Sequence, residues 1–204
     1  AFKKADFDFS PGINVFIGAN ATGKSHVMKL LYCVLKARRD ANGDSPTAKE
    51  FGILLEQKLG RVFRPDRNAI GRLVHRAVGK NKATVFLKTD GGEVGFRLTT
   101  QGNLHIDRDS LPKPEPSIFI PSREVLAMYE GFVKAYEERE LSFDETYRDL
   151  CVALSGTPLR GPRLTAVKKL AEPLEKILNG RVALDGGRFY LAAVAGNLEA
   201  HLLS

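Results

Sequence analysis

One short stretch of the sequence combines residue types that could bind a nucleotide. Residues 18–25 read GANATGKS, in which two glycines five residues apart are followed by a lysine and a serine. Glycines let a loop bring its backbone N–H groups close to phosphate oxygens without a clash from a Cβ atom. A lysine at this place can reach the β- and γ-phosphates, and a serine hydroxyl can bind Mg²⁺. The spacing therefore predicts a phosphate-binding loop for a nucleoside triphosphate.

The predicted site has a defined set of residues. We expect ATP to be bound by Gly18, Ala19, Asn20, Ala21, Thr22, Gly23, Lys24, Ser25 and His26. Lys24 is also the predicted catalytic residue, because it can contact the terminal phosphates. Ser25 is the predicted Mg²⁺ ligand. The predicted cofactors are therefore ATP and Mg²⁺.

A buried strand and a helix must position such a loop. Residues 13–17, INVFI, form an apolar run typical of a strand that is covered on both faces. Residues 24–38 carry apolar side chains at helical spacing, and a helix beginning there would direct the positive end of its dipole at the phosphates. Residues 4–9 alternate between apolar and charged types, which predicts a half-buried strand that turns at Ser-Pro-Gly.

The remaining pattern predicts two lobes of mixed α/β structure, residues 1–116 and 117–204, joined at the proline-rich segment LPKPEP. The first lobe should contain a helix that Ser45 caps and that ends near Leu59, a helix over 67–78, and an antiparallel meander over 83–90, 92–100 and 103–107. The second should be mainly helical. It should begin with a buried strand over 117–121. Three helices should follow: one over 123–138, one that starts at the capping box at 142–145, and one over 163–178 with a kink at Pro173. A hairpin over 181–193 and a helix that begins at Asn197 should complete it.

Composition limits the classes of protein to consider. The chain has 204 residues, 43% of them hydrophobic and 27% charged, as in ordinary globular domains. The sequence contains no apolar run of the roughly 18 residues that a membrane span needs, and no signal-peptide pattern. Cys33 and Cys151 lie far apart and predict buried free thiols, which favours a cytoplasmic location. The net charge is +7, and the excess is concentrated in residues 61–82, which carry seven Lys or Arg and one acid. This segment is either a solvated face or a surface for a polyanion.

Residues 7–25, FDFSPGINVFIGANATGKS, resemble the start of ABC-type ATPase heads of the SMC, RecF and OLD-like kind. The resemblance covers about residues 5–35 and is nearest to bacterial AAA-family proteins of that group, several of which act in antiphage defence. It implies a P-loop NTPase fold with an antiparallel β lobe and a helical lobe. It also implies ATP hydrolysis between two heads that sandwich two ATP molecules. A homodimer, DNA and an effector nuclease are the partners it implies, with no membrane contact.

The same resemblance implies further motifs, of which the sequence offers only weak counterparts. LSGT at 154–157 is similar to the ABC signature, and RVALDG at 181–186 to a Walker B strand that ends at Asp185. Turn chemistry explains both better, because Pro158 follows the first and Gly186-Gly187 the second. Gln57 and Gln101 have no distinctive surroundings, and Ser122 and Arg123 could approach the nucleotide or form a helix cap and a surface cation. We therefore expect the chain to be the N-terminal part of a larger ATPase, incomplete before the signature and Walker B.

Two other functions fit a phosphate-binding loop. A phosphotransferase of the nucleoside-kinase kind would need a lid, which Arg61, Arg64, Arg67 and Arg72 could form. The strand expected ahead of the loop argues against that class. The second alternative is a regulator that binds a nucleotide without hydrolysing it, since the sequence shows no clear catalytic acid.

Overall fold

The computed structural model describes residues 3–41, 43, 46–75, 81–122, 125–138, 141–156, 162–193 and 196–199. The chain divides into two compact units, Ala1–Phe119 and Ile120–Ser204. Each unit has its own hydrophobic core. The division into a nucleotide-binding lobe over 1–116 and a mainly helical lobe over 117–204 stays a prediction.

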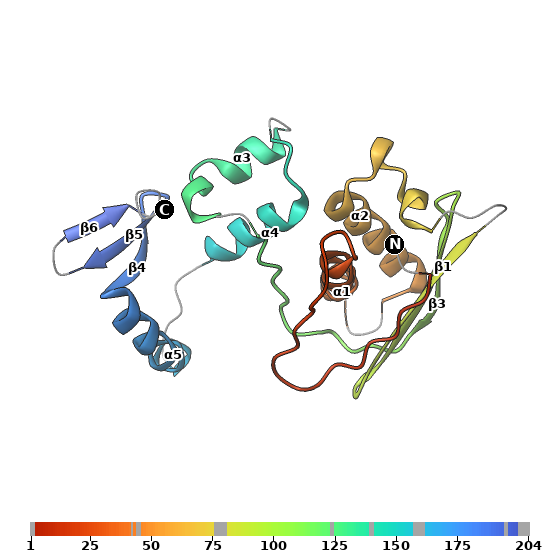
Figure 1. The fold of residues 1–204 in the computed structure, drawn as a ribbon, viewed down its shortest axis with the longest axis horizontal. Helices are drawn as coiled ribbons and strands as arrows, with labels where there is room; N and C mark the ends of the chain where they lie inside the picture. The colour runs from red at the N-terminus through yellow and green to blue at the C-terminus, as the bar shows by residue number, and fades with distance from the viewer. Residues whose placement is uncertain are drawn as a thin grey trace. The chain divides into compact units, whose positions relative to one another are not determined.

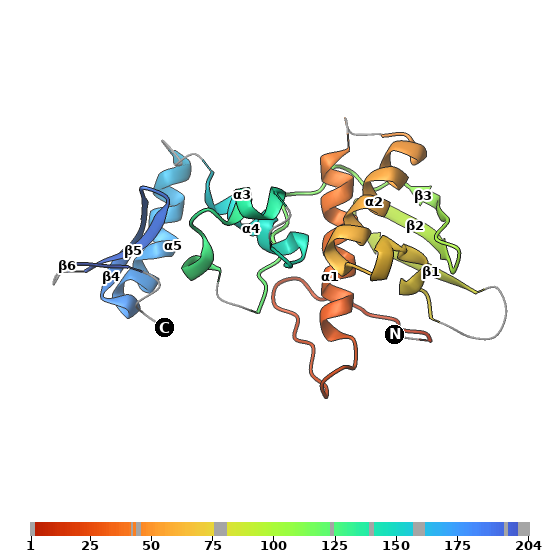
Figure 2. The same ribbon diagram turned by 90° about the horizontal axis from the view of Figure 1, so that it is seen from above.

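The first unit is built from two helices and a three-stranded sheet (Figures 1 and 2). Helix α1 spans Lys24–Asp40 and helix α2 spans Ala48–Phe63. The sheet contains β1 (Lys82–Thr89), β2 (Gly92–Thr99) and β3 (Leu104–Asp109), paired antiparallel in the order β1-β2-β3. The core joins one face of the sheet to both helices through Val34, Phe51, Leu55, Phe96 and Leu98. The helix predicted over 24–38 and the predicted meander are both confirmed.

Helices α1 and α2 pack in opposite directions, which determines what lies beside the start of α1. Near the start of α1, the His26 ring lies 5.6 Å from the ring of Phe63, at the end of α2. About two turns further along α1, the Cys33 thiol donates to the Lys58 carbonyl of α2, with 3.8 Å between sulfur and oxygen. Chain positions therefore rise along α1 as they fall along α2. The end of α2 and the phosphate-binding sequence are neighbours.

A buried ion pair ties the last turn of α1 to the end of β3. Arg38 Nε donates to Asp109 Oδ1 at 3.2 Å, and the two side chains are 2% and 8% exposed. The next residue, Arg39, donates from Nη1 to the carbonyl of Pro114 at 2.6 Å. The ion pair fixes the far end of α1 against the sheet, and Arg39 holds the segment that leaves β3.

The strands predicted over 4–9, 13–17 and 117–121 are wrong. All three segments are irregular, and none pairs with another described segment. Ile13 and Ile17 are 90% and 92% exposed, and Ile118 and Ile120 are also exposed. An apolar run becomes a strand only beside a partner that accepts and donates its backbone hydrogen bonds. Local contacts shape the N-terminal segment instead: the rings of Phe7, Phe9 and Phe16 cluster, and the Ser10 N–H donates to the Asn14 side chain at 3.0 Å.

Two helix predictions in the first unit also need correction. Residues 66–75 form two short 3₁₀ turns, η1 (Asp66–Asn68) and η2 (Ile70–Leu73), instead of the helix predicted over 67–78, whose last residues lie outside the described part. Arg67 and Asn68 adopt left-handed backbone angles, and a Cβ on Gly71 would lie 2.3 Å from the Thr100 carbonyl, so packing against the sheet shapes this segment. Helix α2 is capped by Thr47, whose Oγ1 accepts from the Glu50 N–H. Ser45 lies outside the described residues.

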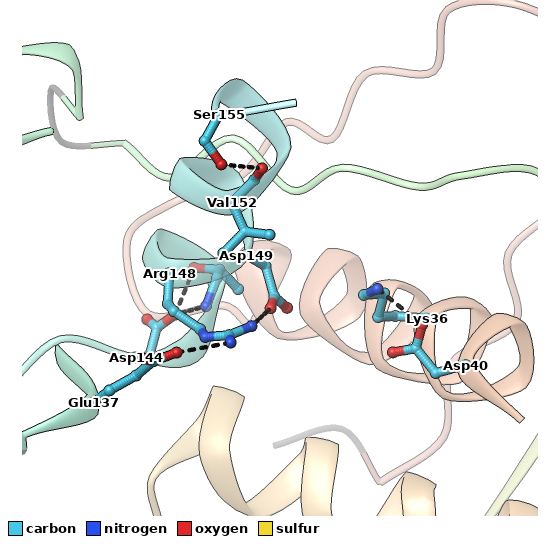
Figure 3. A network of polar contacts seen from close by, with 9 residues as sticks. Lys36, Asp40, Glu137, Asp144, Arg148, Asp149, Val152 and Ser155 are labelled. Carbon is cyan, nitrogen blue, oxygen red and sulfur yellow. Dashed lines mark hydrogen bonds and ion pairs between the residues drawn. The ribbon is translucent and has the colours of Figure 1, made fainter. Parts of the chain in front are cut away.

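The second unit contains η3 (Leu126–Met128), α3 (Phe132–Glu137), α4 (Glu145–Leu154), α5 (Pro162–Leu178) and a sheet of β4 (Gly180–Asp185), β5 (Arg188–Ala193) and β6 (Gly196–Glu199). Its core is aromatic, with Phe132 against Phe143 and Tyr147. Arg148 on α4 donates to Glu137 on α3 at 2.9 Å (Figure 3), and Arg188 donates to Glu130 at 2.6 Å. Figure 3 also shows Lys36 paired with Asp40 along α1.

Several predictions for this unit are confirmed and others are wrong. The helix over 163–178, with Pro173 inside it, and the hairpin at Gly186-Gly187 are confirmed. The helix predicted over 123–138 is reduced to η3 and α3, with Arg123 and Glu124 outside the described residues. Asp144, not Ser142, caps α4, because its carboxylate accepts from the Thr146 N–H. Residues 197–199 belong to β6, so a helix does not open at Asn197; Leu198 pairs with Leu191 instead.

Candidate nucleotide-binding site

Residues 18–23 form a loop that leads directly into α1. Gly23 occupies the N-cap position with φ 96° and ψ 9°, a left-handed conformation that glycine adopts without strain. Ala21 is also left-handed, with φ 62°. The Thr22 hydroxyl donates to the Ala19 carbonyl at 2.9 Å. These features curl the loop back on itself at the N-terminus of the helix.

Lys24 lies against the loop that precedes it. Its ammonium donates to the carbonyls of Gly18 and Ala19, at 2.7 and 2.6 Å. A Cβ on Gly18 would already lie 3.3 Å from Thr22 Oγ1, so a larger residue there would crowd the loop. The lysine charge is therefore held against the Gly18 and Ala19 end of the loop.

The first turn of α1 favours an anion. The backbone N–H groups of His26 and Val27 both donate to the Gly23 carbonyl. No side chain caps the helix, and the first turn contains no acidic residue, so its positive dipole end is not neutralised locally. Ser25 is exposed in this turn. Its hydroxyl is available for a cation that accompanies a phosphate.

His26 connects the loop to the end of α2 through the contact with Phe63. Partial burial of the ring is the main cause that lowers the pKa of His26 below its ordinary value, and nearby positive charge, including that of Lys29, adds to it. His26 is therefore mainly neutral at pH 7. Sequence reasoning did not identify Phe63 as a neighbour of this site, because the antiparallel packing of α1 and α2 brings it there.

The same packing places the start of the basic segment near the loop. Arg61 lies in the last turn of α2, Arg64 is its C-cap, and both are exposed, as is Arg67. Arg72 pairs with Asp66 at 3.4 Å. Of the four arginines proposed as a lid, Arg61 and Arg64 are the two nearest in sequence to Phe63. Arg76 and Lys80 lie outside the described residues.

The other sequence-predicted positions lie on exposed faces, helix ends and turns of the two units. Gln57 is exposed on α2 and Gln101 in the turn between β2 and β3. In the signature-like segment 154–157, Leu154 is the last residue of α4, and the Ser155 hydroxyl donates to the Val152 carbonyl. Residues 154–156 are therefore a helix terminus, and Thr157 lies outside the described residues. Asp185 precedes Gly186 and Gly187, with φ of 56° and 82°, and pairs with Arg188 across the hairpin. Ser122 is exposed.

Within the described residues, no group of three or more His, Cys, Asp or Glu side chains could hold a metal ion. Cys33 and Cys151 are buried free thiols, as predicted, and burial raises the pKa of Cys151 to about 11. The described helices include none that could cross a bilayer.

The chain has partial similarity to DNA replication and repair protein RecF. It is 30% identical to RecF of Lactobacillus gasseri over 79 residues, which are 39% of this chain and 21% of that protein. It is 35% identical to RecF of Lacticaseibacillus casei and of Lacticaseibacillus paracasei over 63 residues, 31% of this chain and 17% of each relative. The match thus spans about a fifth of the relatives' length. No family model matches the chain. No solved structure matches it.

Proposed function

We propose that residues 18–26 bind ATP with Mg²⁺, and that the chain supplies the nucleotide-binding part of an ABC-type ATPase. In this proposal the loop N–H groups and Lys24 bind the β- and γ-phosphates, and Ser25 is a ligand of Mg²⁺. The observation that carries the proposal is the position of the Lys24 ammonium inside the loop at the uncapped start of α1.

Two further observations support the proposal. The left-handed Gly23 lets the loop join the helix without a side chain in the way of a ligand. The partial similarity to RecF adds a family in which a nucleotide site is expected. We assign hydrolysis to two heads that sandwich two ATP molecules, as the resemblance to ABC-type ATPase heads implies.

Calorimetric titration of the chain with ATP in the presence of Mg²⁺ tests the site. Replacing Lys24 with Ala removes a charge-assisted hydrogen-bond donor, worth about 1.5–3 kcal/mol, so ATP should bind roughly ten- to a hundredfold more weakly. Lys36→Ala is the matched control, because Lys36 lies on the same helix and pairs with Asp40 at the surface. Equal ATP affinity in wild type and Lys24→Ala would refute the assignment.

The cellular role we propose is DNA repair, because the relatives are named DNA replication and repair proteins. DNA, a second head and a cytoplasmic location belong to the same proposal. A role in antiviral defence with an effector nuclease stays a prediction from the resemblance. The phosphotransferase reading predicts turnover on a small acceptor by this chain alone, which a coupled assay would detect. A non-hydrolysing regulator would bind ATP without turnover even as a complete, paired protein.

A further inference from the structure

The His26 ring lies at the start of α1 with one side against an aromatic neighbour. Its centroid is 5.6 Å from the centroid of the Phe63 ring, and the two ring planes are tilted by 46°. This separation is within the range in which aromatic rings attract one another. His26 is nevertheless exposed, whereas Phe63 is half-buried and packs against the core of the first unit. The side of the imidazole that faces away from Phe63 is therefore open to solvent.

The position of His26 in α1 brings its side chain to the end of the helix where the phosphate-binding loop lies. His26 is in the first turn, two residues after Lys24, and its backbone N–H donates to the Gly23 carbonyl at 3.0 Å. The Cα–Cβ bonds of a helix tilt toward its N-terminus, so the side chain leans toward the loop. A triphosphate bound by the loop continues into a ribose and a base that lie outside it. The open side of the His26 ring offers a flat surface for that base.

A second group of aromatic rings precedes the loop in the sequence. The rings of Phe7, Phe9 and Phe16 pack on one another, with centroids 5.6 to 6.3 Å apart. They belong to an irregular segment whose backbone pairs with no other described segment, whereas His26 and Phe63 are on two helices that share one core. Ordering a side chain on binding costs free energy, so a ring that is already fixed binds a base better. The pair on the helices is therefore the better surface for a base.

We infer that the His26 ring is the stacking surface for the nucleobase of the bound nucleotide, and that Phe63 is the positioning residue behind it. The inference rests on the proposed function, because the loop must first bind the triphosphate. Every base has a π-face, so an aromatic side chain binds it by stacking without contacting its hydrogen-bonding edge. The base should therefore add affinity through His26, separately from the affinity that the phosphates gain from the loop.

Calorimetric titrations with Mg²⁺ and two ligands, ATP and inorganic tripolyphosphate, test the inference. Loss of one base–aromatic stack weakens binding by roughly five- to a hundredfold, so His26→Ala should bind ATP more weakly by such a factor. His26→Ala should bind tripolyphosphate as the wild type does, because this ligand has no base. His26→Phe restores a flat ring and should recover most of the ATP affinity. Phe9→Ala is the matched control, because Phe9 is an aromatic residue ahead of the loop and is 40% exposed.

Phe63→Leu tests the positioning role. Leucine keeps much of the apolar volume against the core and removes the ring behind His26, so ATP should bind more weakly than to the wild type, by a smaller factor than in His26→Ala. Its affinity for tripolyphosphate should not change. An unchanged ATP affinity in Phe63→Leu would overturn the role of Phe63. Circular dichroism of each variant should show the wild-type helix content.

The two ligands separate failure of this inference from failure of the proposed function. A wild-type chain that binds neither ligand would refute the phosphate site and the stacking surface together. If the wild type binds both and His26→Ala weakens neither, or weakens both equally, the phosphate site stands and the stacking surface is overturned. The stacking surface is also overturned if Phe9→Ala, in place of His26→Ala, causes the selective loss of ATP affinity.

Discussion

At the residue scale, Asp185 could have either of two roles. As a Walker B aspartate it would hold Mg²⁺, and as a turn residue it only ends β4. The structure places it directly before Gly186 and Gly187, which supply the two left-handed residues of a tight hairpin turn. We therefore predict that Asp185→Asn leaves the Mg²⁺-dependent affinity for ATP unchanged within about twofold, measured by calorimetry. Lost Mg²⁺ dependence in a folded Asp185→Asn chain would show that the residue is a ligand.

His26 predicts a pH dependence at the same scale. Its pKa is lower in the folded chain than the ordinary value of 6.5, first because of burial. The unfolded chain therefore binds more protons at this residue than the folded chain does, and the free energy of unfolding should fall as the pH falls through about 6.5. Urea unfolding at pH 8 and pH 5.5 should show a loss of stability that is smaller in His26→Gln. The same loss in both chains would assign the effect to other groups.

At the scale of elements, the Arg38–Asp109 pair joins α1 to β3 and should be important for stability. Both side chains are nearly buried, so removing one leaves the other charge without its partner in a region of low dielectric. Arg38→Ala should lower the free energy of unfolding by about 3–5 kcal/mol, measured by denaturant unfolding. Lys36→Ala, which breaks an exposed pair on the same helix, should cost less than about 1 kcal/mol. Equal costs for the two variants would contradict this role for the buried pair.

The elements that the sequence predicted well are those that depend on local pattern. Helix α1 follows from its apolar spacing and the meander from Asp90-Gly91 and Gly102-Asn103, where each turn lies between alternating strands. The hairpin at Gly186-Gly187 follows from the same logic. In each case the hydrogen-bond partner is the neighbouring segment, so a short window of sequence contains the information.

The elements that it predicted wrongly depend on distant partners. Residues 13–17 have the composition of a central strand, but among the described residues they have no neighbouring strand and stay irregular, with Ile13, Val15 and Ile17 exposed. The sequence predicts a helix over 67–78, and yet the described part of this segment forms short 3₁₀ turns, in which Gly71 packs closely against the Thr100 carbonyl of the turn after β2. The same limit applies to the site. The sequence identified residues 18–26 by motif, whereas Phe63 comes close to His26 only through helix packing.

At the scale of the whole molecule, the charge is uneven. The net charge is +7, and the excess is concentrated in residues 61–82. Because α1 and α2 run in opposite directions, the beginning of this segment lies at the same end of the helix pair as the phosphate-binding loop. Arg61, Arg64 and Arg67 are exposed in this part of the segment, and Arg72 pairs with Asp66. We predict that a bound polyanion contacts these three exposed arginines.

Binding of a labelled DNA duplex at several salt concentrations tests this surface. Each phosphate that a cation neutralises adds about 0.9 to the slope of log affinity against log salt. Replacing Arg61, Arg64 and Arg67 together with Gln should therefore lower the slope by roughly two to three units. The control replaces Lys134, Lys168 and Lys176 with Gln, which removes the same charge from the second unit and should change the slope much less. If both triple variants lower the slope equally, net charge alone attracts the duplex. If the wild-type chain does not bind at low salt, the basic segment is a solvated face and the DNA contacts of the proposed ATPase lie elsewhere.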